Sequence, residues 1–205
     1  MVDATVLRAV VRAGVARGAV ALGIGLTLAA VGLGGAPVAA DAAPVMAPAP
    51  GPSTVQAFMT LYGYVDNSPP GTDIAHPCGP RRGAGGTGTY ADPITFATDV
   101  HELAWCQVIY VPYMERYFIH EDECSQCDHD WKKFHLYRFD MWAGGDAASR
   151  HQPEKGALLR CERTWTRGNS VKDPDNPTIT VDPPSDLPVT NAPIFSPPTT
   201  CWSGP

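Results

Sequence analysis

Glycine and proline interrupt this sequence so often that only short strands are expected between them. The 205 residues include 20 Gly and 21 Pro, and no window has the sustained 3.6-residue spacing of apolar side chains that a long helix requires. The segments between the breaks are rich in β-branched and aromatic residues, and they predict strands at 60–64, 94–98, 108–111, 116–120, 136–142 and 157–166, with an edge strand at 178–181. This pattern predicts a mainly β fold, a small six-stranded barrel with long Gly- and Pro-rich loops and one weak helix candidate at 99–105.

The first 42 residues have the layout of a secretory signal peptide. Arg8, Arg12 and Arg17 precede an uncharged run at 18–35, and small residues then offer cleavage sites after Ala40 or Ala42. A membrane anchor is the alternative, because the run is almost as long as the roughly 20 residues that cross a bilayer. Its glycines and the lack of a basic stop favour cleavage, so we expect a secreted, extracellular protein.

The remaining sequence divides into three parts by composition. Residues 43–54 form a Pro- and Ala-rich linker, 55–171 the predicted domain, and 172–205 a Pro-rich C-terminal extension. A glycine cluster at 83–88 is predicted to be a flexible loop, since no Lys-Ser/Thr or helical pattern follows it to bind phosphate.

The charge of the mature chain limits its partners. Three of the 15 basic and two of the 21 acidic residues lie in 1–42, which leaves 12 and 19 and a net charge of −7. Binding to phosphates needs Lys and Arg that displace counterions, so neither nucleic acid nor an anionic membrane is an expected partner. Nothing in the sequence indicates a cofactor or an obligate partner, and we expect a monomer.

The mature part contains an even number of cysteines, which in an exported chain indicates disulfides. They are Cys78, Cys106, Cys124, Cys127, Cys161 and Cys201. Six cysteines allow 15 pairings, and the sequence does not choose among them.

An acidic segment at 120–131 follows the strand predicted at 116–120. The spacing of Cys124 and Cys127 with His120 and His129 would suit zinc, but disulfides are favoured because there is no second Cys-x-x-Cys pair. Calcium is a further alternative, although the segment lacks the regular spacing of a calcium-binding loop.

Asp140 stands within an aromatic, apolar strand, Phe139-Asp140-Met141-Trp142. A carboxyl group there is costly unless it is paired, hydrogen-bonded or protonated. A carboxylic acid kept protonated by an apolar wall is suited to act as a general acid. The structural alternative is an aspartate that caps a turn.

Aromatic side chains near the acidic residues suit the stacking of sugar rings, although core packing is the commoner role. The candidates for substrate binding are Tyr62, Tyr64, His120, Trp131 and Trp142. Trp131 and Trp142 are expected to be the most exposed, because they border the acidic segment and a Gly-Gly turn.

Several short motifs, taken in order over about residues 56–146, resemble the double-psi β-barrel superfamily. Asp122-Glu123-Cys124 is similar to the Asp-x-Cys segment of barwin-type and kiwellin-type proteins, and Phe139-Asp140-Met141 to the Phe-Asp-Leu segment of expansins and family 45 glycoside hydrolases. Residues 60–66 resemble the first strand of these families, where a Tyr and an Asp line the groove. Asp99, Asp122 and Asp140 have the order of the three aspartates in a domain of lytic transglycosylases.

The resemblance implies a secreted protein active on a structural polysaccharide, either peptidoglycan or a wall glucan. As a hydrolase it would use Asp140 as general acid and Asp66 or Asp99 as base, about 6.5–9.5 Å apart for inversion. As a lytic transglycosylase it would need Asp140 alone, because a hydroxyl of the sugar attacks. A non-catalytic, expansin-like or barwin-like binding protein and a scaffold without activity are the alternatives.

Overall fold

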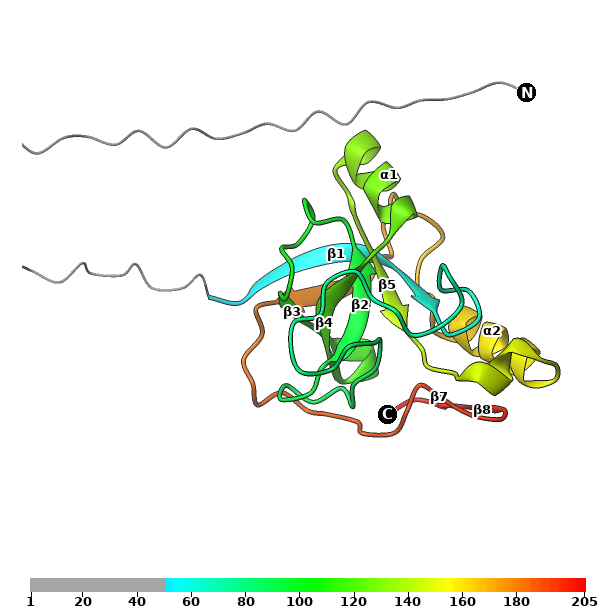
Figure 1. The fold of residues 1–205 in the computed structure, drawn as a ribbon. Helices are drawn as coiled ribbons and strands as arrows, with labels where there is room; N and C mark the ends of the chain where they lie inside the picture. Colours follow the sequence, from blue (N-terminus) through cyan, green and yellow to red (C-terminus); the bar gives the residue numbers. More distant parts are fainter. Residues whose placement is uncertain (1–50) are drawn as a thin grey trace, which may run out of the picture. The chain divides into compact units, whose positions relative to one another are not determined.

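The computed structural model describes residues 51–205, so the predicted signal peptide and residues 43–50 of the predicted linker lie outside the described part. Six strands form a closed barrel in the order β1–β5–β2–β4–β3–β6, with β6 paired back to β1 (Figure 1). They are β1 (Ser53–Tyr62), β2 (Ile94–Thr98), β3 (Val108–Val111), β4 (Arg116–Glu123), β5 (Tyr137–Trp142) and β6 (Thr178–Val181). The pairs β1–β5 and β2–β4 are parallel and the others antiparallel. The predicted mainly β fold with a six-stranded barrel is confirmed.

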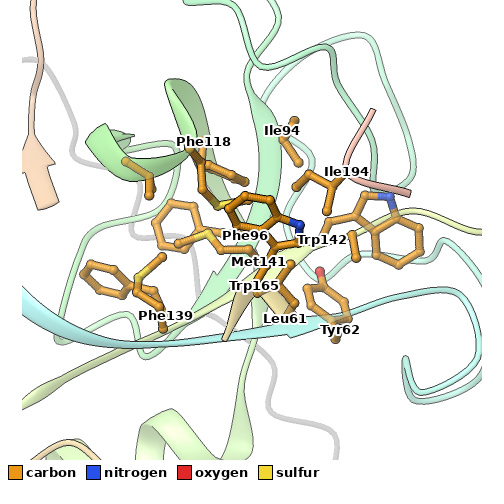
Figure 2. Close-up of a cluster of buried hydrophobic side chains, with 14 of the residues drawn as sticks. Leu61, Tyr62, Ile94, Phe96, Phe118, Phe139, Met141, Trp142, Trp165 and Ile194 are labelled. Carbon is orange, nitrogen blue, oxygen red and sulfur yellow. The ribbon is translucent and has the colours of Figure 1, made fainter. Parts of the chain in front are cut away.

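The barrel interior is filled by alternate side chains of its strands. In β1, Ala57, Met59 and Leu61 are buried, while Phe58 and Thr60 between them are partly exposed. In β5, Phe139 and Met141 are fully buried on either side of Asp140. Successive side chains of a strand point to opposite faces, so this alternation places Asp140 on the outer face. Figure 2 shows Phe139 and Met141 in the cluster with Phe96 and Phe118.

Two helices lie outside the barrel, and neither was predicted (Figure 1). The strand expected at 157–166 is wrong, because α2 (Glu154–Trp165) occupies that segment and buries Leu158, Cys161 and Trp165 along one face. The acidic segment forms α1 (Ser125–Phe134), whose first turn is capped by Cys124 Sγ accepting from Cys127 N at 3.1 Å. The helix expected at 99–105 is a series of turns.

The barrel also uses residues on both sides of the predicted 55–171 segment. β1 starts at Ser53, and residues 178–181 form β6, which lies between β1 and β3 and therefore is not an edge strand. Short elements complete the fold: η1 (Pro112–Met114), η2 (Ala147–Arg150), and the hairpin of β7 (Phe195–Ser196) and β8 (Thr200–Cys201).

Three disulfides and one arginine hold the long connections. The disulfides join Cys78 to Cys106, Cys124 to Cys127, and Cys161 to Cys201. Between β1 and β2, Arg81 forms ion pairs with Asp92 at 2.7 Å and with buried Glu121 at 3.0 Å. The glycine cluster at 83–88 is attached to the barrel, because Gly85 and Gly88 accept backbone hydrogen bonds from Thr95 and Tyr117. The segment is a loop, as expected, and these two hydrogen bonds attach it to β2 and β4.

Candidate functional site

An open, acidic cleft of about 610 Å³ lies over the end of β1, the middle of β5 and the junction of β4 with α1. The loop that follows β1 forms one wall. Six carboxylates line the cleft: Asp66, Asp73, Asp122, Glu123, Asp128 and Asp140. Concave surfaces with convergent polar groups are the usual place for ligand binding and catalysis, and three of the four predicted catalytic aspartates meet in this one.

Asp140 lies on the cleft floor because of its register in the sheet. It pairs with Thr60 of β1 on one side and with Ala97 of β2 on the other. Its outward side chain therefore lies between two neighbouring strands, and its Oδ1 accepts a hydrogen bond from Thr60 Oγ1 at 2.8 Å. The carboxyl group is half-buried, and it reaches the cleft.

The surroundings of Asp140 favour its protonated form. Burial raises its pKa to about 6, and the charges of Asp66 and Asp122 also raise it, while the Thr60 hydrogen bond and the charge of Arg138 lower it. A general acid works best with a pKa near the working pH. Of the two roles predicted for Asp140, this environment suits the general acid, since its one hydrogen-bond donor is a threonine rather than a turn backbone.

Asp122 is held by three donors at the side of the cleft. Tyr62 Oη donates to its Oδ2 at 2.9 Å, and the backbone nitrogens of Ala75 and Glu123 donate to its Oδ1 at 3.1 and 3.0 Å. Burial raises the pKa of Asp122 despite these hydrogen bonds. Burial and the neighbouring Asp122 raise the pKa of Tyr62 well above its ordinary value. Asp122 is thus fixed in place, and its negative charge raises the pKa of Asp140.

Asp66 lies in the turn after β1, where its Oδ1 accepts from Gly63 N at 2.7 Å. Desolvation raises its pKa, and the hydrogen bonds from the Gly63 backbone and from Glu162 of α2 oppose that rise. Burial, followed by the charges of Asp66 and Asp140, raises the pKa of Glu162 to about 8. Gly63 makes room for this group, since a Cβ there would lie 2.9 Å from Glu162 Oε1. Glu162 therefore lies buried on α2 next to Asp66, and its Oε1 has no hydrogen-bond partner within residues 51–205.

Replacing Glu162 with Gln should flatten the pH dependence of stability. The pKa of Glu162 is about 8 in the folded chain against an ordinary 4.5, so its contribution is complete below pH 4.5 and is lost as pH rises through 8. Gln keeps a hydrogen-bond donor and does not ionise. Between pH 5 and pH 8, wild type should lose roughly 1–3 kcal/mol more of its free energy of unfolding than Glu162→Gln does. Urea denaturation at both pH values measures this.

Glu123→Gln is the control for that experiment, because its side chain is exposed. It should retain the wild-type pH dependence. An equal change in both variants would show that general charge, and not the buried carboxyl group, sets the dependence.

The other predicted site residues lie away from the cleft lining. Asp99 is buried beyond the end of β2. Burial alone would raise its pKa, but hydrogen bonds from the backbone and ring of His101, both at 2.7 Å, lower it on balance. His120 is fully buried between Phe96 and Trp105, and its Nδ1 lies 3.1 Å from Ala104 O. The structure therefore brings neither Asp99 nor His120 to Asp140.

Among the predicted aromatic residues, Tyr62 alone lines the cleft. The expected exposure of Trp142 is wrong, because its ring is 5% exposed and packs edge-on against Tyr62. Trp131 is half-buried on α1 next to Tyr137, and Tyr64 contacts the guanidinium of Arg150. Stacking of a sugar on tryptophan is thus not built into this cleft.

The zinc alternative for the acidic segment is overturned. Cys124 and Cys127 form a disulfide with each other, and His120 is buried at a distance from the cleft. Within residues 51–205, one group of three potential ligands comes close together, namely His76, Cys78 and Cys106, and its two cysteines are also disulfide-bonded. In the same part of the chain no helix is long and apolar enough to cross a bilayer.

Three polar residues with unusual surroundings, two of them next to cleft carboxyl groups, were not found from the sequence. Thr60 contacts Asp140 only because of the β1–β5 register. Glu162 was missed because its segment was expected to be a strand. Glu102, whose pKa burial raises to about 8, lies in a turn, where its Oε2 accepts from Thr98 Oγ1 at 2.7 Å and from Arg138 N at 3.0 Å. The signal for Glu162 was available in the helical spacing of the apolar residues around it.

The fold and the cleft define the class: a small, disulfide-bonded β-barrel protein with a cluster of carboxyl groups on its outer face. A family model described as "DDB_G0273701 N-terminal domain" matches residues 54–202, and the chain belongs to this family. A relative from Dictyostelium discoideum, "Uncharacterized protein DDB_G0273701/DDB_G0273221", is 42% identical over 86 residues. The match covers 42% of this chain and 38% of the relative, so it spans well under half of either protein. No solved structure matches the chain significantly.

Proposed function

We propose that the cleft binds a structural polysaccharide and that Asp140 is the general acid in cleavage of a glycosidic bond. The observation that carries the proposal is the carboxyl group of Asp140, which opens to the cleft with a pKa of about 6 and has two further carboxyl groups beside it. Asp140 gives its proton to the glycosidic oxygen as the C–O bond breaks, so the leaving sugar departs as an alcohol.

Asp66 is the candidate base for the hydrolase form of this reaction. It shares the cleft with Asp140, whereas Asp99, the other predicted base, does not line it. In this form Asp66 accepts a proton from the water that attacks the sugar carbon. In the transglycosylase form a hydroxyl of the same sugar attacks, Asp140 takes up that proton in turn, and Asp66 and Asp122 act through their charge.

The barrel supports the finer relationship to the double-psi β-barrel superfamily that the motifs suggested. It is closed, has six strands and contains two parallel pairs, β1–β5 and β2–β4. Asp122 and Asp140 of the shared motifs both line the cleft. We assign the chain to this superfamily as part of the proposal.

Secretion is also part of the proposal. Three disulfides use all six cysteines, as is usual for proteins of oxidising compartments. The predicted signal peptide agrees with this placement, and a wall polysaccharide outside the cell is the corresponding substrate.

The proposal is tested by incubating the protein with peptidoglycan, chitin and cellulose. Mass spectrometry of the soluble fraction should detect new reducing ends or anhydro-sugar ends, and the two products identify the hydrolase and the transglycosylase. These products should disappear with Asp140→Asn. Co-sedimentation with a polysaccharide that releases no fragments would instead establish the non-catalytic binding protein. If the protein neither binds nor cleaves any of the three polysaccharides, the proposed substrate class is wrong.

Removing the hydroxyl group that contacts Asp140 should shift the pH dependence of activity. Asp140 acts while protonated, so the wild-type rate should fall as pH rises past about 6. Thr60 donates to the carboxylate form and so lowers the pKa. We expect Thr60→Val to move this alkaline limb upward by about 0.5–1 pH unit. Rates measured from pH 4 to 9 give the limb, and Thr54→Val, at an exposed position of the same strand, is the control.

If the alkaline limb of the pH–rate profile does not move in Thr60→Val, or moves equally in Thr54→Val, then a group other than Asp140 controls it.

A further inference from the structure

The lining of the acidic cleft contains many hydrogen-bond acceptors and few free donors. Six carboxyl groups line it, and no Lys, Arg or His does. The hydroxyl of Tyr62 donates to Asp122, and the amide of Asn67 donates to two backbone carbonyls. In the described part of the chain, three side-chain donors of the lining therefore stay free for a ligand: Ser68, Ser125 and Gln126.

The cleft carboxyl groups also have few counterions. Within residues 51–205, one ion pair closer than 4.0 Å involves them, between Asp128 and Lys132 of α1 at 3.7 Å. Arg81 and Arg138 pair with carboxylates that do not line the cleft. A concave surface with charges of one sign attracts ligands of the opposite sign, so this cleft favours a cation.

Half of the six carboxyl groups have no part in the proposed reaction, and we call them the accessory carboxyl groups: Asp73, Glu123 and Asp128. Asp73 and Glu123 are exposed and Asp128 is half-buried. They lie on three different segments, namely the loop after β1, the end of β4 and α1. A ligand in the cleft can therefore meet negative charges at several points along its length.

Stacking on aromatic rings contributes little in this cleft. Tyr62 is the one aromatic residue of its lining, and this side chain is buried, with its ring packed edge-on against Trp142 at 5.3 Å. Hydrogen bonds and charge must therefore select the ligand. An exposed ion pair changes affinity by at most about fivefold, but a polymer with a charge on every sugar forms several pairs at once.

We propose that the polysaccharide of this cleft is a cationic one, built of amino sugars with free amino groups, and that the accessory carboxyl groups bind its ammonium groups. This inference rests on the proposed function of the cleft. An ammonium group has three donors and no acceptor, so it complements the lining. An N-acetyl group replaces this charge with a carbonyl that needs a donor, and an acidic sugar is repelled. Deacetylated chitin has the required chemistry.

The test is calorimetric titration with two oligosaccharides of equal length, the hexamers of glucosamine and of N-acetylglucosamine, at about pH 5.5, where aliphatic amines are protonated. The full chain carries Asp140→Asn, so that the oligosaccharides stay intact. The glucosamine hexamer should bind at least about tenfold more tightly in dilute buffer, as two or three exposed ion pairs allow. The preference should shrink in about 0.5 M NaCl, because salt screens exposed charges.

Two further variants in the same background test the accessory carboxyl groups. Asp73→Asn/Glu123→Gln removes two of them and should weaken binding of the glucosamine hexamer by roughly 2–30-fold, without weakening binding of the N-acetylated hexamer. Asp175→Asn/Asp186→Asn is the matched control, because it removes two charges at exposed positions away from the cleft lining. It should bind both hexamers as the Asp140→Asn chain does.

The inference is overturned if the N-acetylated hexamer binds as tightly as the glucosamine hexamer, if neither binds, or if both double variants lose the same affinity. Activity of the wild-type chain separates this inference from the proposed function. Cleavage of chitin, cellulose or peptidoglycan in preference to deacetylated chitin would refute the cationic substrate and leave the proposed reaction standing. Preferential binding of the glucosamine hexamer without cleavage of any polysaccharide would refute the general-acid role and support the cationic ligand.

Discussion

Asn at position 140 should lower the rate of glycosidic-bond cleavage by about 10²–10⁴-fold, the usual contribution of a general acid. The amide cannot supply a proton, but its oxygen can still accept the 2.8 Å hydrogen bond from Thr60. The fold should therefore be retained. Since burial disfavours the charged form of Asp140, the free energy of unfolding at pH 8 should be unchanged or higher. Product release from peptidoglycan and urea denaturation measure the two quantities.

Asp186→Asn is the matched control, because it changes the same charge at an exposed position away from the cleft lining. It should have the wild-type rate. If Asp140→Asn also cleaves at the wild-type rate, Asp140 is not the acid, and the proposed mechanism is wrong even if the polysaccharide binds.

Removing the disulfide between Cys161 and Cys201 should cause the largest loss of stability among the three disulfides. It joins residues 40 positions apart, and the chain-entropy relation gives about 4 kcal/mol for a loop of this length. The disulfide fixes the β7–β8 hairpin on α2, where Trp202 stacks on Trp165 at 4.3 Å and its carbonyl accepts from Trp165 Nε1 at 3.1 Å. We expect the Cys161→Ala/Cys201→Ala variant to lose about this amount in urea denaturation.

The Cys124→Ala/Cys127→Ala variant provides a built-in comparison. Its disulfide spans a separation of three residues, for which the same relation gives about 2 kcal/mol. Equal losses in the two variants would mean that local packing, and not closure of the chain, sets the contribution of each disulfide.

The sequence-based predictions that were correct came from local features of the sequence, such as the alternation of apolar and polar residues. Five of the barrel strands were expected within a few residues of their positions, because alternating and aromatic segments between glycines and prolines favour strands. The even number of cysteines indicated disulfides, although not their pairing. Asp140 was recognised because a carboxyl group in an apolar strand needs a special environment.

The errors came from segments whose structure depends on distant partners. α2 was taken for a strand because its apolar residues acquire meaning only when one helical face packs on β1. His120 and Trp142 were expected at a binding surface, yet the barrel buries both. Thr60 had no distinguishing local pattern, since its contact with Asp140 follows from the register of β1 with β5. Glu162 was missed together with the helix that carries it.

The order of residues along this chain was enough to specify short strands, the presence of disulfides and one unusual aspartate, because each follows from composition or from a period of two residues. The pairing of strands and cysteines depended on which distant segments meet, and so did the grouping of Asp66, Asp122 and Asp140 in one cleft. Those contacts arise when the barrel closes and buries its apolar side chains.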